Sequence, residues 1–313
     1  MFARSTPLAR GVVAGLAVTA SLALAACGSS SPSKSSNPLQ HSASKGTVVI
    51  GSANFPENQL LAEIYSLALS AKGVKVTDKF NIGSREVYYP EVKTGAISIM
   101  PEYNGALLTV SVDPTSTAAT TSEVNAALKS GLPSTLEILN SSAATDSDSV
   151  TVTQAFAKAH HLSSIGDLKP LAHTMVFGGP SECKTRSDCI PGLKKNYGLV
   201  FKGFDALDES GPITLAALKD GKVQAADVFT TTPQIISDKL VSLADPKFNF
   251  AAQNVTPLVY KAAMTPTIIS TLNEISAKLT TAALLQMDTA IGVQHANYST
   301  VAKAWLSQEG IPS

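Results

Sequence analysis

The sequence predicts an α/β fold with two lobes, and three observations support this prediction. Short β-branched runs alternate with amphipathic helical patterns from Thr47 onward, which is typical of α/β units. A stretch rich in Ser, Thr and Ala, residues 115–145, separates two such regions. A strand pattern within residues 248–263 is suited to cross back to the first region. We therefore expect hinge strands between two lobes, with a ligand crevice beyond the carboxyl ends of the strands.

The N-terminal segment has the pattern of a secretory signal. Two arginines precede an apolar run from Gly11 to Ala26, which is too short to span a membrane comfortably. The run ends in Leu-Ala-Ala-Cys at Cys27, which resembles the lipobox of bacterial lipoproteins. We expect residues 1–26 to be a signal peptide, and residues 27–46 to be a lipidated Cys27 and a flexible, Ser-rich tether. An ordinary signal peptide followed by a stray cysteine is the alternative.

The charge balance limits the classes of partner. Lys and Arg together number 24, and so do Asp and Glu. Such a neutral chain is not suited to bind nucleic acid or an acidic membrane surface. We expect a monomer that is secreted and contacts the outer face of the bacterial cytoplasmic membrane through its lipid anchor alone.

The two remaining cysteines lie close together in the sequence. With Cys27 assigned to lipid, Cys183 and Cys189 are left in a compartment where disulfides persist. A bridge between them would close a small loop and stabilise the fold by about 2 kcal/mol in the chain-entropy model. A metal site with two cysteine ligands is the alternative, although no histidine lies near in sequence.

The first region opens with a predicted β-α-β unit. Strand patterns at residues 47–52 and 74–82 flank a helical pattern at residues 56–72. The predicted apolar face of this helix carries Leu60, Ile64, Leu67 and Ala71. We interpret Glu57 and Glu63 as charges on the helix surface.

A short helix and a third strand complete the first region. Residues 85–95 predict a helix that turns Val87 and Val92 inward, and residues 96–100 predict the strand that leads into Tyr103. One amphipathic helix is expected at residues 121–132, within the stretch of small residues.

The second region repeats the alternation, and the tail is helical. Strands are expected at 149–153, 173–179 and 225–231, and helices at 155–161, 213–221, 233–240, 266–279, 281–294 and 298–310. We expect residues 47–147 and 254–313 to form one lobe, and residues 148–253 the other.

Four blocks of sequence resemble a known family in order and spacing. They are VIGSANFPENQLLAEIYSLALSAKGVKV, GSREVYYPEVKTGAISIMPEYNGALL, PSECKTRSDCIPGLKKNYG and AALKDGKVQAADVFTTTPQI. The chain resembles the osmoprotectant-binding lipoproteins of ABC importers, which take glycine betaine, carnitine or choline. The resemblance implies a two-lobed periplasmic-binding-protein fold, type II-like, that closes on a small-molecule ligand. It also implies delivery to a membrane permease and its ATPase.

The resemblance places Tyr103 and Asn104 in a ligand cage. Tyr103 falls on the tyrosine of a Pro-Glu-Tyr-Thr-Gly-Thr motif, in which the threonines are replaced by Asn104 and Ala106. In the first block, Asn54, Phe55 and Gln59 keep the family pattern, and Asn54 and Gln59 could face the crevice. The alternatives are a structural tyrosine at a turn and, for Gln59, a capping or solvated amide.

The second region supplies the other predicted ligand contacts. Arg186 falls on the position of an arginine that grips a ligand carboxylate, with a salt bridge to Asp188 or Glu182 as the alternative. Phe229 falls where relatives place an aromatic residue, and Thr230 follows with further donors.

At two predicted cage positions this chain has a different type of residue from the family. Asp148 and Gln253 stand where relatives have tyrosines, although Asp146 could be the acid that faces the crevice. Fewer rings favour a ligand with hydroxyl or other hydrogen-bonding groups as an alternative to betaine, choline or carnitine.

No enzyme motif accompanies this pattern. Neither HExxH nor a Gly-rich phosphate loop occurs, and no nucleophile and base stand at a catalytic spacing. We expect a binding protein without catalytic activity, cofactor or metal; a ligand sensor outside transport and an enzyme are the alternatives.

Overall fold

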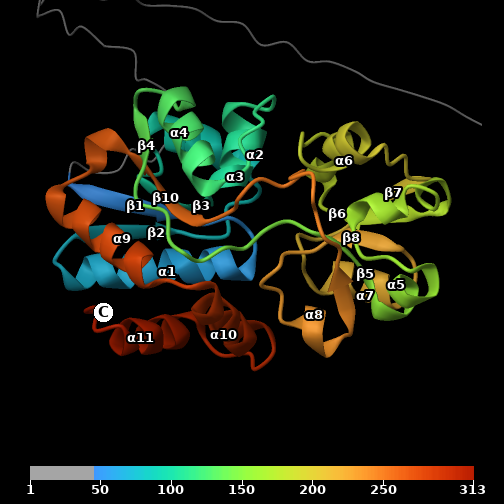
Figure 1. The fold of residues 1–313 in the computed structure, drawn as a ribbon. Coiled ribbons are helices and arrows are strands. Elements are labelled where there is room, and N and C mark those ends of the chain that lie inside the picture. The colour runs from blue at the N-terminus through green and yellow to red at the C-terminus, as the bar shows by residue number, and fades with distance from the viewer. Residues whose placement is uncertain (1–45) are drawn as a thin grey trace, which may run out of the picture. The chain divides into compact units, whose positions relative to one another are not determined.

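Two five-stranded sheets organise the residues described by the computed structural model, 46–313 (Figure 1). All of them fall within one compact unit, His41–Ser313. The predicted signal peptide, the lipidated Cys27 and the tether up to residue 45 lie outside the described residues. We call the part built on the first sheet lobe I and the part built on the second sheet lobe II.

The sheet of lobe I is mixed, with strand order β2-β1-β3-β10-β4. Its strands are β1 (Thr47–Gly51), β2 (Lys75–Lys79), β3 (Ile99–Tyr103), β4 (Leu136–Ile138) and β10 (Val255–Tyr260). Strand β1 pairs in parallel with β2 and β3, whereas β10 runs antiparallel between β3 and β4. Because β10 comes late in the chain, lobe I is completed only after lobe II has been traversed.

The sheet of lobe II has strand order β7-β6-β8-β5-β9. Its strands are β5 (Val150–Thr153), β6 (Val176–Gly179), β7 (Gly203–Ala206), β8 (Ala225–Asp227) and β9 (Leu240–Ser242). Strand β6 pairs in parallel with β7 and β8, and β5 is antiparallel to β8 and β9.

Helices cover both sheets. Those of lobe I are α1 (Pro56–Ala71), α2 (Arg85–Thr94), α3 (Asn104–Leu107), α4 (Thr121–Gly131), α9 (Pro266–Lys278), α10 (Thr281–Gly292) and α11 (Tyr298–Gln308). Those of lobe II are α5 (Gln154–His160), α6 (Ile190–Tyr197), α7 (Pro212–Lys219) and α8 (Gln234–Ser237). A π-helical turn at Leu108–Val112 continues α3, and short 3₁₀ turns fill several loops. The C-terminal helices α9, α10 and α11 all contact α1, so the tail closes the core of lobe I (Figure 1).

Two neighbouring segments connect the lobes. One leads from β4 to β5, and the other leads from β9 back to β10 (Figure 1). They touch at an antiparallel bridge between Thr145 and Asn254, and the N–H of Asp146 donates to the carbonyl of Gln253 at 3.2 Å. The chain therefore has paired hinge segments, as the strand pattern predicts.

Most predicted helices and strands are present. The errors concern which helix residues are buried and several short elements. Leu60 and Ile64 are fully buried, but Ala71 is exposed; the buried face of α1 continues through Ala68 and Leu69 instead. In α2, Val92 is buried as predicted, whereas the inward placement of Val87 is wrong, since 52% of it is exposed. Strands β4, β7 and β9 and helices α3 and α6 were not predicted. The three strands and α3 span only three or four residues each, too few to show a clear period.

The turn after β3 packs tightly on the returning hinge segment. A Cβ atom added at Gly105 would lie 2.4 Å from the carbonyl oxygen of Ala252 and 3.1 Å from Ala251. These are backbone neighbours, which cannot rotate away. Glycine is therefore required for the close approach of the two segments.

We expect Gly105→Ala to lower the free energy of unfolding by about 1–3 kcal/mol, because the added methyl overpacks a backbone contact. Urea unfolding followed by circular dichroism measures this loss. Gly203→Ala is the matched control, since its added Cβ would have no neighbour nearer than 3.7 Å. Equal losses in the two variants would contradict the close approach.

Candidate functional site

Three aromatic rings converge where strand ends of the two sheets face each other. Phe55 follows β1, Tyr103 ends β3 and Phe229 follows β8. The ring centroids of Phe55 and Tyr103 are 5.9 Å apart, and those of Phe55 and Phe229 are 5.1 Å apart with the rings at 60°. Phe229 therefore carries a ring from lobe II into contact with the core of lobe I.

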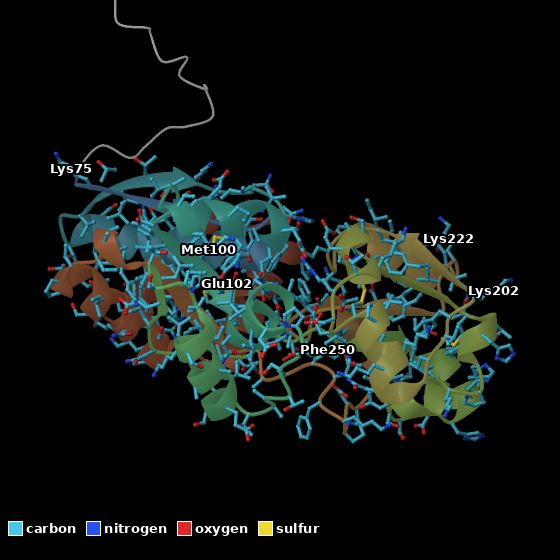
Figure 2. All side chains as sticks on the ribbon, turned by 90° about the horizontal axis from the view of Figure 1, so that it is seen from above. Lys75, Met100, Glu102, Lys202, Lys222 and Phe250 are labelled. Carbon is cyan, nitrogen blue, oxygen red and sulfur yellow. A yellow bond between two sulfur atoms is a disulfide. The ribbon has the colours of Figure 1, made fainter. Side chains whose placement is uncertain are left out.

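The buried carboxylate of Glu102 fixes the backbone of Tyr103. Glu102 is fully buried and accepts three hydrogen bonds from the Arg85 guanidinium, at 2.9–3.2 Å. It also accepts from the hydroxyl of Tyr88 at 2.8 Å and from the N–H of Tyr103 at 3.1 Å. Figure 2 shows Glu102 close to Met100 in the interior of lobe I, away from Lys75 at its outer edge. With so many partners, the buried charge is well satisfied.

Glu57 is buried in the site, which corrects its assignment to the helix surface. Only 5% of it is exposed. Its carboxylate accepts from the hydroxyl of Tyr103 at 2.5 Å and from that of Thr231, in lobe II, at 2.7 Å. The helical pattern misses this role because both partners are remote in sequence. Glu57 therefore joins the tyrosine of one lobe to a threonine of the other.

Two further buried carboxyl groups lie beside Glu57. Asp146, in the first hinge segment, accepts from the N–H of Thr231 at 3.1 Å. Asp288 of α10 lies close enough to Glu57 to affect its pKa, yet neither of its carboxylate oxygens has a hydrogen-bond partner of good geometry. Burial, reinforced by the neighbouring charges, raises the pKa of Glu57 and Asp146 well above the usual range and that of Asp288 to about 7.

Arg186 of lobe II pairs with acids of both lobes. Its Nε and Nη2 donate to the two carboxylate oxygens of Glu86 in lobe I, at 3.0 and 3.1 Å, and its Nη1 lies 3.7 Å from Glu209. Burial opposes ionisation of Glu86, but the hydrogen bonds and charge of Arg186 lower the pKa of Glu86 to about 2. The salt bridge is thus with Glu86 and Glu209, instead of the predicted alternatives Asp188 or Glu182.

The lobes also meet through the two residues that follow Arg186. The hydroxyl of Thr109 donates to Asp188 at 2.7 Å, and the hydroxyl of Ser187 donates to the carbonyl of Thr109 at 2.7 Å. Together with the contact between Thr231 and Glu57, these bonds hold the lobes against each other around the rings.

Asp148 and Gln253 form a pair in the hinge segments. The Gln253 amide donates to the Asp148 carboxylate at 2.6 Å and accepts from the N–H of Asp148 at 2.6 Å. Gln253 is 2% exposed, so the pair is largely withdrawn from solvent. Asp146 and Asp148 both face the space between the lobes.

Two cavities lie around these groups. The first, which we call the inner cavity, has a volume of only about 30 Å³. It is lined by Phe55, Arg85, Tyr103, Ala106, Asp146, Asp148, Arg186, Glu209, Phe229 and Gln253. The second, which we call the large cleft, has a volume of about 640 Å³ and shares Phe55, Asp146, Glu209 and Phe229 with the inner cavity. The two phenylalanine rings therefore border both cavities.

The structure brings most of the predicted ligand residues to these cavities. Tyr103, Asp148, Arg186, Phe229 and Gln253 line the inner cavity. Asn54 lines the large cleft, where its amide, oriented with nitrogen toward acceptors, donates to Glu209 at 3.0 Å. Sequence reasoning did not propose Phe55, Arg85 or Asp288 as site residues. Phe55 could have been found, since it lies inside the matching block GSANFPENQ.

Asn104, Thr230 and Gln59 line neither cavity. Asn104 is fully buried: its amide oxygen accepts from the N–H of Asn254 at 2.7 Å, and its amide nitrogen donates to Asn125 at 2.8 Å. The hydroxyl of Thr230 accepts from the N–H of Ser147 at 2.9 Å. Gln59 lies half-buried on α1. The residue next to Thr230, Thr231, reaches the large cleft instead.

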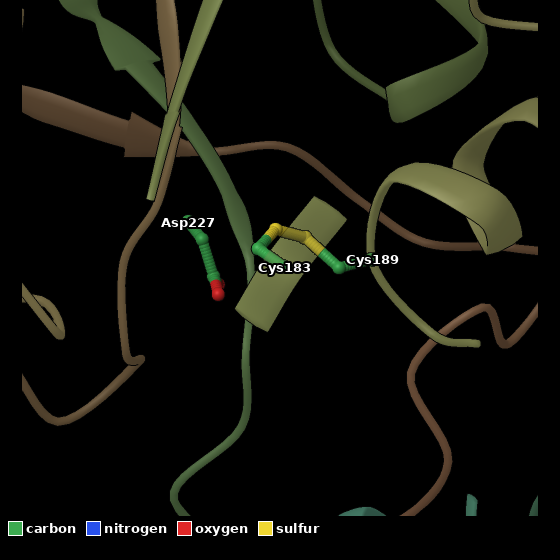
Figure 3. Close-up of side chains that lie close together, drawn as sticks. All are labelled: Cys183, Cys189 and Asp227. Carbon is green, nitrogen blue, oxygen red and sulfur yellow. A yellow bond between two sulfur atoms is a disulfide. The ribbon is translucent and has the colours of Figure 1, made fainter. Parts of the chain in front are cut away.

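The loop that carries Arg186 is closed by a disulfide. Cys183 and Cys189 are bonded, with their Cα atoms 5.2 Å apart. Asp227 lies beside the bridge, and one of its oxygens is within 4.8 Å of both sulfur atoms (Figure 3). Because the sulfurs are bonded to each other, this group is arranged as a disulfide with a neighbouring acid, and the bridge restricts the loop that presents Arg186.

Comparison with known proteins identifies the family. Residues 46–308 match the model of the substrate-binding domain of ABC-type glycine betaine transport systems. The chain belongs to this family. It is therefore the substrate-binding component of an ABC transport system, as the resemblance predicts, and the family is not one of enzymes.

Similar proteins support this assignment. The glycine betaine-binding protein YehZ of Escherichia coli (strain K12) is 26% identical over 287 residues, which cover 87% of this chain and 93% of YehZ. A solved structure described as a glycine betaine/carnitine/choline ABC transporter has a TM-score of 0.67 at 21% identity, over 84% of this chain and 99% of that one. A choline-binding protein in complex with choline has a TM-score of 0.64 at 16% identity, over 85% and 89% of the two chains. The two-lobed periplasmic-binding-protein fold is thus confirmed.

None of the helices within residues 46–313 combines the length and apolar character that crossing a membrane requires.

The unpartnered carboxyl group of Asp288 predicts a pH dependence of stability. Its pKa is raised to about 7 in the folded protein from the usual 3.8, so the folded state binds this proton more tightly than the unfolded state. The stabilisation by this proton is therefore present at acid pH and is lost as the pH rises through 7. We expect Asp288→Asn to be more stable relative to wild type at pH 8 than at pH 5, by about 2 kcal/mol in the free energy of unfolding.

Urea unfolding at the two pH values measures this difference. Asp78→Asn, at an exposed position on β2, is the matched control and should leave the pH dependence unchanged. The same slope in wild type and Asp288→Asn would contradict the raised pKa.

Proposed function

We propose that this chain is an extracytoplasmic lipoprotein that captures a small osmoprotectant of the glycine betaine, choline or carnitine class between its lobes. A signal peptide directs its export, Cys27 carries the lipid anchor, and the protein acts as a monomer. It delivers the ligand to a membrane permease, whose ATPase drives uptake. The observation that carries the proposal is the convergence of Phe55, Tyr103 and Phe229 between the lobes of a chain of this family.

The ring cluster is suited to a quaternary ammonium group. Such a group has no N–H to donate, so the negative faces of aromatic rings are its main source of attraction. The carboxylate of Asp148 in the inner cavity adds long-range attraction for a cation. Asp146, which also lines the inner cavity, adds to it when a bound cation favours its ionisation. The two arginines of the cavity are already paired, Arg85 with Glu102 and Arg186 with Glu86. A net attraction for cations remains.

Ligand capture requires the rings to move. An inner cavity of about 30 Å³ has room for about one water molecule. A trimethylammonium group therefore enters as Phe55 and Phe229 separate, and the space gained opens toward the large cleft, which both rings line. The ligand then contacts both lobes and stabilises the form in which they meet.

Asp148 and Gln253 favour a second candidate, a ligand with hydroxyl groups. Their side chains bond to each other at 2.6 Å, where relatives have rings. Each could exchange this bond for one to a ligand hydroxyl without leaving a buried group unsatisfied. The transport role is the same in this case, and the specificity is shifted toward a small polar or aromatic hydroxylated molecule.

We expect Phe55→Leu to weaken binding of choline by about 2- to 30-fold, because leucine keeps the bulk and loses the π face. Isothermal titration of the purified protein with choline, glycine betaine and carnitine measures this. Phe248→Leu is the matched control, since Phe248 is 64% exposed and lines neither cavity. If no member of the class binds the wild-type protein, the ligand assignment is wrong.

Two variants separate a role of Arg186 in ligand binding from its role in joining the lobes. Both Arg186→Gln and Glu86→Gln remove the same ion pair, but only Arg186→Gln removes a group that could hold a ligand carboxylate. We expect Arg186→Gln to weaken glycine betaine at least about tenfold more than choline, whereas Glu86→Gln affects both ligands alike. Equal losses for both ligands in Arg186→Gln would limit this arginine to joining the lobes.

A further inference from the structure

The large cleft is strongly acidic. Among the described residues that line it, Lys219 is the only basic side chain, and this lysine is paired with Asp238 at 2.7 Å. The carboxyl groups of Glu57, Asp146 and Asp288 form its buried part, with exposed fractions of 4–6%. Its volume of about 640 Å³ is within the range of sites for small molecules.

Most acids of the large cleft already have hydrogen-bond partners within the protein. Asp208 accepts from the N–H groups of Ile213 and Thr214 at the start of α7. Glu57 and Asp146 have partners in Tyr103 and Thr231. Asp288 differs from all of these, because both of its buried carboxylate oxygens lack a hydrogen-bond partner of good geometry.

A buried carboxylate without donors is costly, and a ligand that supplies donors removes the cost. A quaternary ammonium group cannot do so, since it has no N–H. A protonated primary amine carries three N–H donors and a full charge, and so could bond to more than one of the three acids.

We propose that Glu57, Asp146 and Asp288 form a second cation subsite, in the large cleft, that binds the protonated primary amino group of a small aliphatic amine. The subsite adjoins the inner cavity, because Asp146 and the rings of Phe55 and Phe229 line both spaces. It rests on the proposed function only in that both ligands enter between the same lobes.

Binding at this subsite releases protons. The carboxyl group of Asp288 interacts electrostatically with Glu57 from α1, Tyr103 from β3, Asp146 from the first hinge segment, Thr231 from lobe II and Tyr298 from α11. No basic group is among them, so the bound ammonium would be the charge that favours ionisation of the acids. The affinity for the amine therefore rises between pH 6 and pH 8, while the amine itself stays protonated.

A matched pair of ligands tests the subsite. The probes are n-butylamine and butyltrimethylammonium, which share one alkyl chain and differ in the N–H donors. Isothermal titration is carried out on wild type, Asp288→Asn and the control Asp78→Asn. We expect Asp288→Asn to weaken n-butylamine at least about tenfold and to change butyltrimethylammonium less than about twofold, with Asp78→Asn like wild type.

A second measurement needs no variant. Titration of wild type with n-butylamine in buffers of different ionisation enthalpy should show proton release at pH 7, and the affinity should increase from pH 6 to pH 8. Binding without proton release and without pH dependence would overturn the subsite.

The outcomes separate the two proposals. Binding of choline or betaine but not of n-butylamine overturns the subsite and leaves the proposed function intact. Unchanged affinity of Asp288→Asn for both n-butylamine and butyltrimethylammonium has the same meaning. Binding of n-butylamine through Asp288, with no binding of choline, betaine or carnitine, supports the subsite and overturns the proposed ligand class. Failure of all the probes to bind overturns both.

Discussion

The buried carboxylate of Glu102 holds two lobe I groups on which the inner cavity is built, the backbone N–H of Tyr103 and the guanidinium of Arg85. The ion pair cancels the charge of Arg85 inside the protein. Arg186 is paired in the same way by Glu86 and Glu209. Since both arginines have partners, neither opposes the binding of a cation, and the proposed preference for cations depends on this arrangement of ion pairs.

The same contacts that build the site also join the lobes. Glu57 bonds to Tyr103 in lobe I and to Thr231 in lobe II, and Arg186 of lobe II reaches Glu86 of lobe I. A group that binds near the rings therefore acts on the contact between the lobes as well. This coupling is the physical basis on which a permease could distinguish loaded from empty protein.

The sequence predicted what depends on local pattern and family motifs. The β-α-β opening and the hinge strands follow from periodicity, and Tyr103 and Phe229 follow from motifs at strand ends. Glu57 and Val87 were assigned wrongly because a helical pattern does not show which packed element covers each face. Asp288 could not be foreseen, since α10 is remote in sequence from α1, which carries Glu57. The ligand roles of the site residues, the lobe boundaries and the lipid anchor stay predictions.

Phe229 reaches across from one lobe to pack on Phe55 of the other, and this contact has a consequence for affinity. The rings meet edge to face, so in the proposed site a bound ammonium group would have to replace this ring–ring contact. Measured affinity is then the difference between ring–ligand and ring–ring attraction. Relatives that differ only in how well these rings fit each other could hold the same solute with very different strength.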